Sequence, residues 1–190
     1  MATLLKIVAA GTVGVMLGLL VTIVSLSPAT RGLVAGPWRG SPREGTTDVD
    51  PYTLASINRS GTLPLGAAEG LSFVATADSA GGPLSPECDY AVTGAMPAAR
   101  FWTLGALTPD GFSIPNAAQR YAFTSAEVLR QNREPVLITV ATEARSGNWL
   151  PIGKPMPYVL ALRLYDTGLS AVGSTFDAAT LPRIQKLRCH

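Results

Sequence analysis

Residues 157–165, "PYVLALRLY", are the stretch that decides the fold of this chain. Side chains alternate between the two faces of a strand, so Leu162 and Leu164 share one face, while Ala161, Arg163 and Tyr165 share the other. The pattern predicts a strand of a β-rich core. A charge among apolar strand residues must be paired or must face water or a ligand. We expect a structural ion pair for Arg163, with contact to a ligand or partner as the alternative.

Other strands follow outward from this stretch in both directions, with turn signals between them. The strong strand that precedes it is "PVLITVAT", and the two are joined by a connection that contains "GNWLP". Shorter alternating or β-rich runs predict the remaining strands at 71–77, 88–94 ("CDYAVTG"), from 99 onward ("ARFWTLGAL") and at the end of the tail 174–190.

Helices are expected to be few and short. Asp50 can cap a helix that starts at Pro51 and ends at Gly61. The segment 121–132, "YAFTSAEVLRQN", predicts a short strand followed by two helical turns. The fold class is therefore mainly β, a sandwich or partly closed barrel with one or two short helices.

The N-terminus differs from the rest of the chain. Twenty residues from Ile7 to Leu26 carry no charge, which is about 30 Å of helix and matches the hydrocarbon core of a bilayer. We expect an uncleaved single-pass anchor in the lipid bilayer, with a cleaved signal peptide as the rival interpretation. Gly14 and Gly18 form a GxxxG spacing that permits close packing on another membrane helix.

These features predict a division into an anchor at 1–27, a juxtamembrane linker at 28–47 without regular structure, and a β-rich extracytoplasmic domain at 48–190. Within the linker, Trp38 either anchors at the lipid headgroups or packs on the domain. The positive-inside rule gives no clear orientation. Cys88 and Cys189 both follow the anchor, and such a pair in an exported domain predicts one disulfide. The expected location is the inner membrane, with the C-terminal domain on the periplasmic side.

The residues for common catalytic chemistry are scarce. The single histidine is His190, at the end of the sequence, so His-based triads and zinc sites have no obvious members. No phosphate-binding loop or dinucleotide motif is present, and no metal or cofactor is expected. The net charge of +2 and the scattered basic residues argue against nucleic acid as a partner.

Carboxylates and tryptophans remain as candidate contact residues. Asp78 and Asp89 flank a Gly-Gly turn and are interpreted first as solvated turn residues, with glycoside acid–base chemistry as the alternative. Trp102 lies in a predicted strand and is interpreted as core. Trp149 in "GNWLP" lies after a turn at Gly147, where it is expected to point inward as a structural plug, with ligand or partner contact as the alternative.

Five segments in this order resemble one known family: "GPW", "DPYTLASINRSGTLPL", "FWTLGALTPDG", "NWLPI" and "LALRLYD", between Gly36 and Ile184. The chain is similar to the domain of unknown function 1214. In longer relatives that domain follows the domain of unknown function 1254. The resemblance implies a β-rich domain and a separately encoded partner that carries the domain of unknown function 1254. It implies no activity and no catalytic residues.

Three hypotheses follow for the function. The first is a membrane-anchored extracytoplasmic domain that binds or assembles with a partner and is not an enzyme. The second is an envelope or carbohydrate-active enzyme that uses carboxylates. The third is an accessory subunit that docks on a membrane complex through its transmembrane helix.

Overall fold

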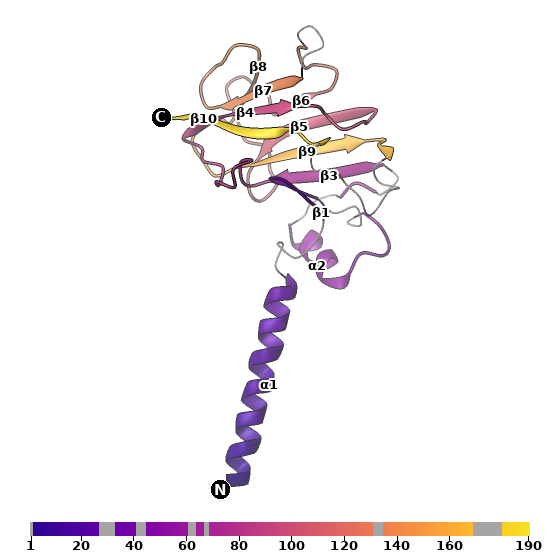
Figure 1. The fold of residues 1–190 in the computed structure, drawn as a ribbon, viewed down its shortest axis with the longest axis vertical. Helices are drawn as coiled ribbons and strands as arrows, with labels where there is room; N and C mark the ends of the chain where they lie inside the picture. Colours follow the sequence, from indigo (N-terminus) through magenta and orange to yellow (C-terminus); the bar gives the residue numbers. More distant parts are fainter. Residues whose placement is uncertain are drawn as a thin grey trace.

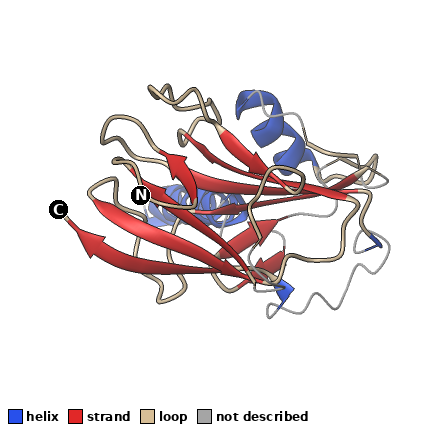
Figure 2. Ribbon diagram, turned by 90° about the horizontal axis from the view of Figure 1, so that it is seen from above, coloured by secondary structure: helices blue, strands red, loops and turns tan. Residues whose placement is uncertain are grey.

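The computed structural model shows two β-sheets that pack on a shared core (Figure 1). It describes residues 2–26, 33–40, 45–60, 64–66, 69–130, 135–168 and 180–190. The expected mainly β class is confirmed, and the sheets form a sandwich that does not close into a barrel. Figure 2 shows the strands from above, gathered into two layers. The ten strands are β1 (Leu33–Ala35), β2 (Trp38–Gly40), β3 (Gly70–Ala75), β4 (Cys88–Gly94), β5 (Phe101–Leu107), β6 (Ala122–Thr124), β7 (Val136–Ala141), β8 (Asn148–Pro151), β9 (Val159–Tyr165) and β10 (Arg183–Cys189).

The larger sheet has the strand order β1-β2-β3-β9-β5-β6, and all of its pairs are antiparallel. Strand β9, from the segment 157–165, lies in its centre between β3 and β5. Leu160, Leu162 and Leu164 on β9 are completely buried, while Arg163 and Tyr165 on the other face are half-buried. The predicted alternation is therefore correct, and the leucine face points into the sandwich.

The smaller sheet has the order β10-β4-β7-β8. Strand β8 pairs parallel to β7, and the other pairs are antiparallel. Its inner face supplies Tyr90, Val92, Ile138 and Ile184, each with essentially no exposed surface. The removal of this apolar surface from water, together with that of the leucine face of β9, is the main force that holds the two sheets together.

The N-terminal hairpin β1–β2 was not predicted. It lies within the expected irregular linker and extends the larger sheet by pairing with β3. Trp38 is wholly buried, and its indole Nε1 donates to the carbonyl oxygen of Pro182 at 2.7 Å. Of the two alternatives for Trp38, the structure therefore shows packing on the domain. Residues 27–32 and 41–44 of the expected linker lie outside the described residues.

Helix α1 (Ala2–Leu26) projects away from the sandwich in Figure 1. Its described side chains are exposed, and the helix is long and apolar enough to cross a membrane or to act as a signal sequence. Apart from the helix's own backbone, no described residue comes within 4 Å of a Cβ built on Gly14 or Gly18.

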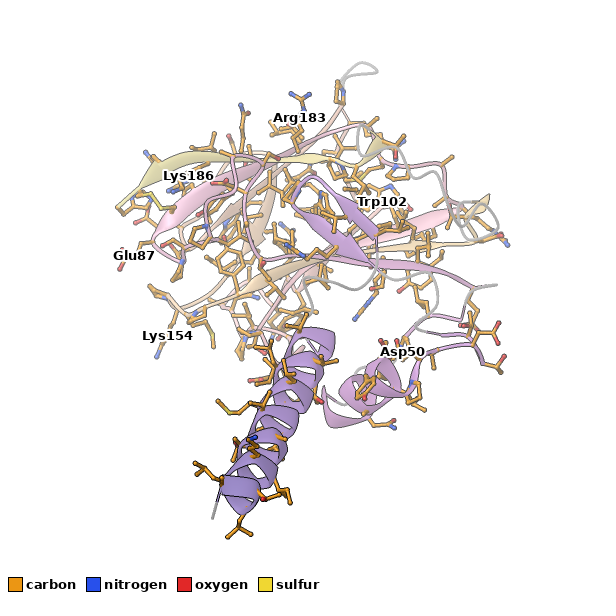
Figure 3. The ribbon with its side chains drawn as sticks, turned by 60° about the horizontal axis from the view of Figure 1, so that its bottom comes forward. Asp50, Glu87, Trp102, Lys154, Arg183 and Lys186 are labelled. Atoms are coloured by element: carbon orange, nitrogen blue, oxygen red, sulfur yellow. A yellow bond between two sulfur atoms is a disulfide. The ribbon has the colours of Figure 1, made fainter. Side chains whose placement is uncertain are left out.

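Helix α2 (Pro51–Ser60) begins where the sequence predicts, beside Asp50, which Figure 3 labels. The Asp50 carboxylate accepts from the amides of Tyr52 and Thr53 and so caps the helix. The expected end of the helix at Gly61 lies outside the described residues.

A second predicted helix is wrong within the described residues. After β6, residues 125–127 form a turn, and no helix is present up to Arg130. Tertiary hydrogen bonds override the local preference here, because the backbone of Leu129 bonds to the side chain of Asn148 rather than to its own preceding turn.

The predicted disulfide between Cys88 and Cys189 is present and encloses most of the domain, because the two cysteines are 101 positions apart in the sequence. It joins the start of β4 to the end of β10, and the amide of His190 donates to the carbonyl oxygen of Glu87 beside it. The C-terminal strand is thereby fixed at both of its ends, because Trp38 holds Pro182 just before the strand begins.

Candidate binding site

Three hollows in the described part of the chain contain candidate residues from the sequence, among them one beside Trp102 and one over Asp89. The larger one, about 720 Å³, lies beside Trp102 between the β4–β5 connection and the segment that follows β6. We call it the Trp102 pocket. The smaller one, about 390 Å³, lies over Asp89 on the smaller sheet. The two hollows have no lining residue in common, and their polar groups are arranged differently.

Trp102 is the floor of the larger hollow. It is the second residue of β5 and is only 3% exposed, because its side chain enters the core beside Leu164 of β9. Its backbone is fixed by two hydrogen bonds with Ser125, one from the Ser125 amide to the Trp102 carbonyl at 2.9 Å and one from the Trp102 amide to Ser125 Oγ at 3.4 Å. The core interpretation of Trp102 is thus correct for its burial, but the residue also lines a hollow.

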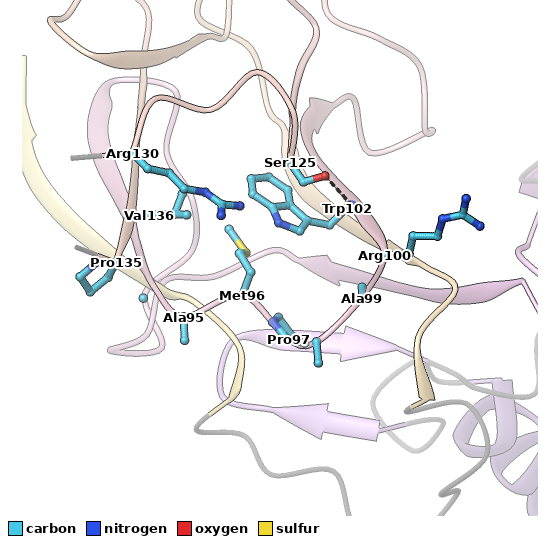
Figure 4. Close-up of a pocket in the computed structure, with 12 residues that line it drawn as sticks. Ala95, Met96, Pro97, Ala99, Arg100, Trp102, Ser125, Arg130, Pro135 and Val136 are labelled. Carbon is cyan, nitrogen blue, oxygen red and sulfur yellow. Dashed lines mark hydrogen bonds between the residues drawn. The ribbon is translucent and has the colours of Figure 1, made fainter. Parts of the chain in front are cut away.

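The indole nitrogen of Trp102 has no hydrogen-bond partner among the described residues, although the rest of the side chain is packed. Among those residues the fully enclosed polar side-chain atom without a partner is the Tyr158 hydroxyl, so Trp102 Nε1 keeps some accessible surface. Figure 4 shows the indole flanked by Met96 and Arg130 in the pocket. An indole nitrogen is only a donor, so this atom offers an unused hydrogen bond to an acceptor in the pocket.

One wall of the pocket is the β4–β5 connection, residues 95–100. The buried Thr167 donates from its hydroxyl to the carbonyl oxygen of Ala98 at 2.8 Å, and the Arg100 amide donates to the Asp166 carbonyl oxygen at 3.3 Å. Pro97 restricts the backbone further. Since these bonds tie the connection to the end of β9, this wall keeps its shape without a ligand.

The opposite wall is the segment after β6, and Asn148 fixes it. The buried Asn148 side chain accepts from the Leu129 amide at 2.7 Å and donates to the carbonyl oxygens of Leu129 and Leu137, each at 2.9 Å. Arg130, which lines the pocket, follows directly in the chain. Asn148 is therefore a positioning residue for Arg130, a role that the sequence interpretation of "GNWLP" as a turn did not reveal.

The pocket is positive, and its walls combine polar and apolar surface. Its charged lining residues are Arg100 and Arg130, and no acidic residue is among those that line it. Arg100 forms a 3.7 Å ion pair with Asp166, with both side chains exposed, so this pair is weak. Arg130 has no ion pair with any residue that the structure describes.

Asp89 differs from Arg130 and the Trp102 indole, because its carboxylate is buried and already accepts hydrogen bonds from neighbouring side chains. Arg145 donates to its Oδ2 from Nε at 2.9 Å and from Nη2 at 2.8 Å, and Arg188 Nε donates to the same oxygen at 3.2 Å. His190 Nε2 lies 3.3 Å from Oδ1. We call these four residues the Asp89 cluster; Asp89 is 3% exposed, whereas Arg145, Arg188 and His190 are 20%, 59% and 41% exposed.

The net effect of this environment is to lower the pKa of Asp89. Burial alone raises that pKa, but the hydrogen bonds from Arg145, His190 and Arg188 together outweigh it. In turn, the Asp89 carboxylate raises the pKa of Arg145, helped by Glu143 at 3.2 Å. The cluster joins three segments, namely β4, the β7–β8 connection and the end of β10. Together with the adjacent disulfide it fastens the C-terminus, so we assign it a structural role.

The remaining candidates lie apart from each other. Asp78 is buried and caps the turn after β3, where its Oδ1 accepts from the amides of Ala80 and Gly82 at 2.9 Å. Asp78 lines a third hollow, beside Gly36 of the hairpin, and not the one over Asp89. Acid–base catalysis on one glycosidic bond requires two carboxylates in the same hollow. Asp78 and Asp89 therefore do not meet this requirement.

Trp149 and Arg163 both lie on outer faces of the sheets. Trp149 alternates with the buried Asn148 and Leu150, so its half-buried ring points away from the core, against the inward orientation expected from the sequence. Its indole Nε1 donates to the Ala141 carbonyl oxygen at 3.0 Å and is thereby used. Arg163 faces outward between Ser72 and Thr103, and no ion pair to it occurs within the described part of the chain.

The residues that complete the pocket were not candidates at the sequence level. Arg130 and Met96 come from irregular segments, and no periodic pattern indicates which way such residues point. The side-chain amide of Asn148 was a usable signal, because an asparagine at the start of a buried strand needs several hydrogen-bond partners. Within the described residues there is no group of three or more His, Cys, Asp or Glu side chains that could hold a metal ion.

Comparisons with solved structures give the fold. The crystal structure of the VPA0106 protein from Vibrio parahaemolyticus matches with a TM-score of 0.61 and 20% identity, over 89% of this chain and 42% of that protein. A putative uncharacterized protein from Burkholderia cenocepacia matches with a TM-score of 0.41 and 16% identity, over 78% of this chain and 48% of that one. This chain therefore spans less than half the length of either protein.

No curated protein shows significant similarity to the chain. The family model described as "Protein of unknown function (DUF1214)" matches residues 69–168, from the start of β3 to just past β9. This range includes both walls of the Trp102 pocket, and it covers more than half of the 190 residues. The chain therefore belongs to the DUF1214 family of proteins of unknown function.

Proposed function

We propose that this protein is a single-pass membrane-anchored binding domain that uses the Trp102 pocket, with its C-terminal domain on the periplasmic side of the inner membrane. In this proposal residues 1–27 anchor the chain, 28–47 connect, and 48–190 carry the site. The observation that carries the proposal is the pocket itself, in which neither the indole N–H of Trp102 nor Arg130 has a partner among the described residues, between two fixed walls. Its volume of about 720 Å³ is in the range typical of small-molecule sites.

The membrane placement has two supports. Helix α1 is apolar and, where its side chains are described, exposed, so it needs an apolar environment outside the chain. The disulfide is characteristic of an oxidising compartment, which agrees with a domain on the far side of the membrane from the cytosol. The resemblance to longer relatives motivates a further part of the proposal, namely a separately encoded partner that carries the domain of unknown function 1254.

A carboxylate enzyme is less well supported. The Asp89 carboxylate is saturated by arginines and Asp78 holds a turn, so neither is poised to transfer a proton to a substrate. We therefore place binding, rather than hydrolysis, at the Trp102 pocket.

The test is native mass spectrometry of the full chain, extracted from its own membranes in mild detergent. We expect an adduct that is lost in Ala95→Trp, which fills the exposed mouth of the pocket, and kept in Ala117→Trp, which places the same side chain on an exposed turn elsewhere. An adduct that persists in Ala95→Trp, or no adduct on the wild-type protein, argues against the proposed site. Co-purified proteins in the same preparation reveal whether a partner is present.

A further inference from the structure

The chemistry of the Trp102 pocket narrows its ligand to one class. We propose that the pocket binds an organic carboxylate with an apolar body, an inference that rests on the proposed function. The carboxylate accepts from Trp102 Nε1 and from the Arg130 guanidinium, and the apolar body lies against Met96, Pro97 and Pro135.

The charge of the ligand follows from what the pocket offers and what it lacks. Among the described residues, its side chains provide one guanidinium without an ion pair and one indole donor without a hydrogen-bond partner, and none of the carboxylates described lines the hollow. A neutral acceptor satisfies the indole but leaves Arg130 without a counter-charge. A carboxylate satisfies both, because its two oxygens accept from separate donors and charge-assisted hydrogen bonds are the stronger kind.

The apolar body follows from the remaining lining. Met96, Pro97 and Pro135 belong to the walls, and the unbranched methionine side chain adapts to ligands of different shape. Since both walls are already fixed by Thr167 and Asn148, little conformational entropy is lost when a ligand enters. Small inorganic anions lack the surface to cover this apolar lining, which favours an organic acid over phosphate or sulfate.

The three tryptophans of the chain provide a direct readout. The indole of Trp38 donates to the Pro182 carbonyl and that of Trp149 to the Ala141 carbonyl, whereas the indole of Trp102 has no partner within the described part of the chain. In the full chain, labelled with ¹⁵N-tryptophan and held in lipid nanodiscs, each indole N–H gives one signal, and Trp102→Phe identifies the third. We expect 2-naphthoate to move the Trp102 proton downfield with saturation, while the signals of Trp38 and Trp149 stay in place as internal controls.

Matched ligands and variants separate charge from apolar contact. The neutral twin, 2-naphthalenemethanol, is expected to bind at least about tenfold more weakly, which is the usual value of a hydrogen bond to a charged group. Arg130→Gln should remove most of this difference in affinity, because it should weaken the binding of the acid and not that of the alcohol. Lys154→Gln removes the same charge at an exposed position well away from Trp102 in Figure 3 and should change neither affinity. Octanoate and 1-octanol repeat the comparison for an acyl chain, and empty nanodiscs correct for partitioning.

Each outcome decides the inference. Preferred binding of octanoate identifies a lipid-derived acid, and preferred binding of 2-naphthoate a soluble aromatic acid; both support the proposal. Equal binding of acid and alcohol, or an acid affinity that Arg130→Gln leaves unchanged, overturns the ligand class but preserves a binding pocket. If neither acids nor alcohols move the Trp102 signal, the ligand class is wrong, and the native adduct of the wild-type chain then decides separately whether the proposed site stands.

Discussion

The Asp89 cluster and the Trp102 pocket both place arginines beside a hollow, yet they differ in spare bonding capacity. In the Asp89 cluster, two arginines and a histidine surround one buried carboxylate, and the neighbouring disulfide locks the segments that supply them. In the Trp102 pocket, Arg130 and the indole N–H have no partner among the described residues. Charged residues in a hollow therefore indicate binding only when their donor and acceptor groups are not already hydrogen-bonded within the fold.

The largest expected effect concerns the disulfide beside the Asp89 cluster. Replacing Cys88 and Cys189 together by alanine removes a cross-link between positions that are 101 apart in the sequence. The chain-entropy model gives a loss of about 4.7 kcal/mol in the free energy of unfolding, because the unfolded chain regains conformational freedom. Urea unfolding of the full chain in detergent, followed by circular dichroism, measures it. A loss below about 1 kcal/mol would show that the remaining contacts fasten the C-terminus without the disulfide.

The next effect concerns the charge at the centre of the Asp89 cluster. Asp89→Asn leaves Arg145 facing a neutral group in a mostly buried site, and we expect a loss of about 3 kcal/mol in unfolding free energy at pH 7. The matched control is Glu143→Gln, whose side chain is 70% exposed and which should change stability by less than about 0.5 kcal/mol.

The same variant predicts a pH dependence. The pKa of Asp89 in the folded protein lies below its ordinary value of 3.8. A lowered folded-state pKa stabilises the fold above the unfolded value, and this contribution disappears as the pH falls through the folded-state pKa. The stability difference between wild type and Asp89→Asn should therefore be constant from pH 7 to about 5 and shrink below about pH 4. A difference that stays constant down to pH 2.5 contradicts the assignment.

A smaller effect is expected at Asn148, which fixes one wall of the Trp102 pocket. Asn148→Ala removes three hydrogen bonds to the backbone of Leu129 and Leu137, with an expected loss of about 2 kcal/mol. It should also weaken the binding of 2-naphthoate, although Asn148 does not line the pocket. The reason is that the segment before Arg130 loses the hydrogen bonds that position it. Asn58→Ala on the exposed face of α2 is the control and should leave both quantities unchanged. If Asn148→Ala bound 2-naphthoate with the wild-type affinity, Asn148 would not be a positioning residue for Arg130.

The smallest effect is a gain in stability. The Tyr158 hydroxyl is buried without a partner among the described residues, and burial raises the pKa of Tyr158 well above its usual range, with smaller contributions from Tyr90 and Asp89. Tyr158→Phe removes this unsatisfied hydroxyl and should stabilise the fold by about 1 kcal/mol. The unfolding midpoint in urea reports the change. A destabilised variant would indicate that the hydroxyl has a partner in solution, such as a buried water molecule.

The sequence was sufficient for much of the sandwich but not for its edges. Regular alternation predicted β9, β4 and β7, since a strand with one buried face imposes that pattern. Hairpin β1–β2 has only three residues per strand, too few for a period, and the burial of Trp38 depends on Pro182, 144 positions away. The missing helix after Thr124 has the same cause, because Asn148 captures the Leu129 backbone.

The candidate site was predictable only in part. The strand pattern places Trp102 on the same face as the buried Leu104, but it does not show that the edge of the ring reaches a hollow. Asp89 was a candidate contact residue because it flanks a Gly-Gly turn with Asp78, but its first interpretation as a solvated turn residue is wrong, since its carboxylate is buried. Its partners Arg145 and Arg188 lie 56 and 99 residues away, so the saturation of the carboxylate depends on the complete fold. Arg130, in an irregular segment, carried no signal at all.

The most direct test of the comparison is the shift in the thermal unfolding midpoint that 2-naphthoate produces in Arg130→Gln and in Arg145→Gln, relative to the wild-type chain. Arg130 lines the open pocket, and Arg145 belongs to the closed cluster. A ligand that binds only the folded state raises the midpoint. We predict the wild-type shift in Arg145→Gln, from a lower starting midpoint, and little or no shift in Arg130→Gln. A shift that is lost in Arg145→Gln and retained in Arg130→Gln would contradict the account.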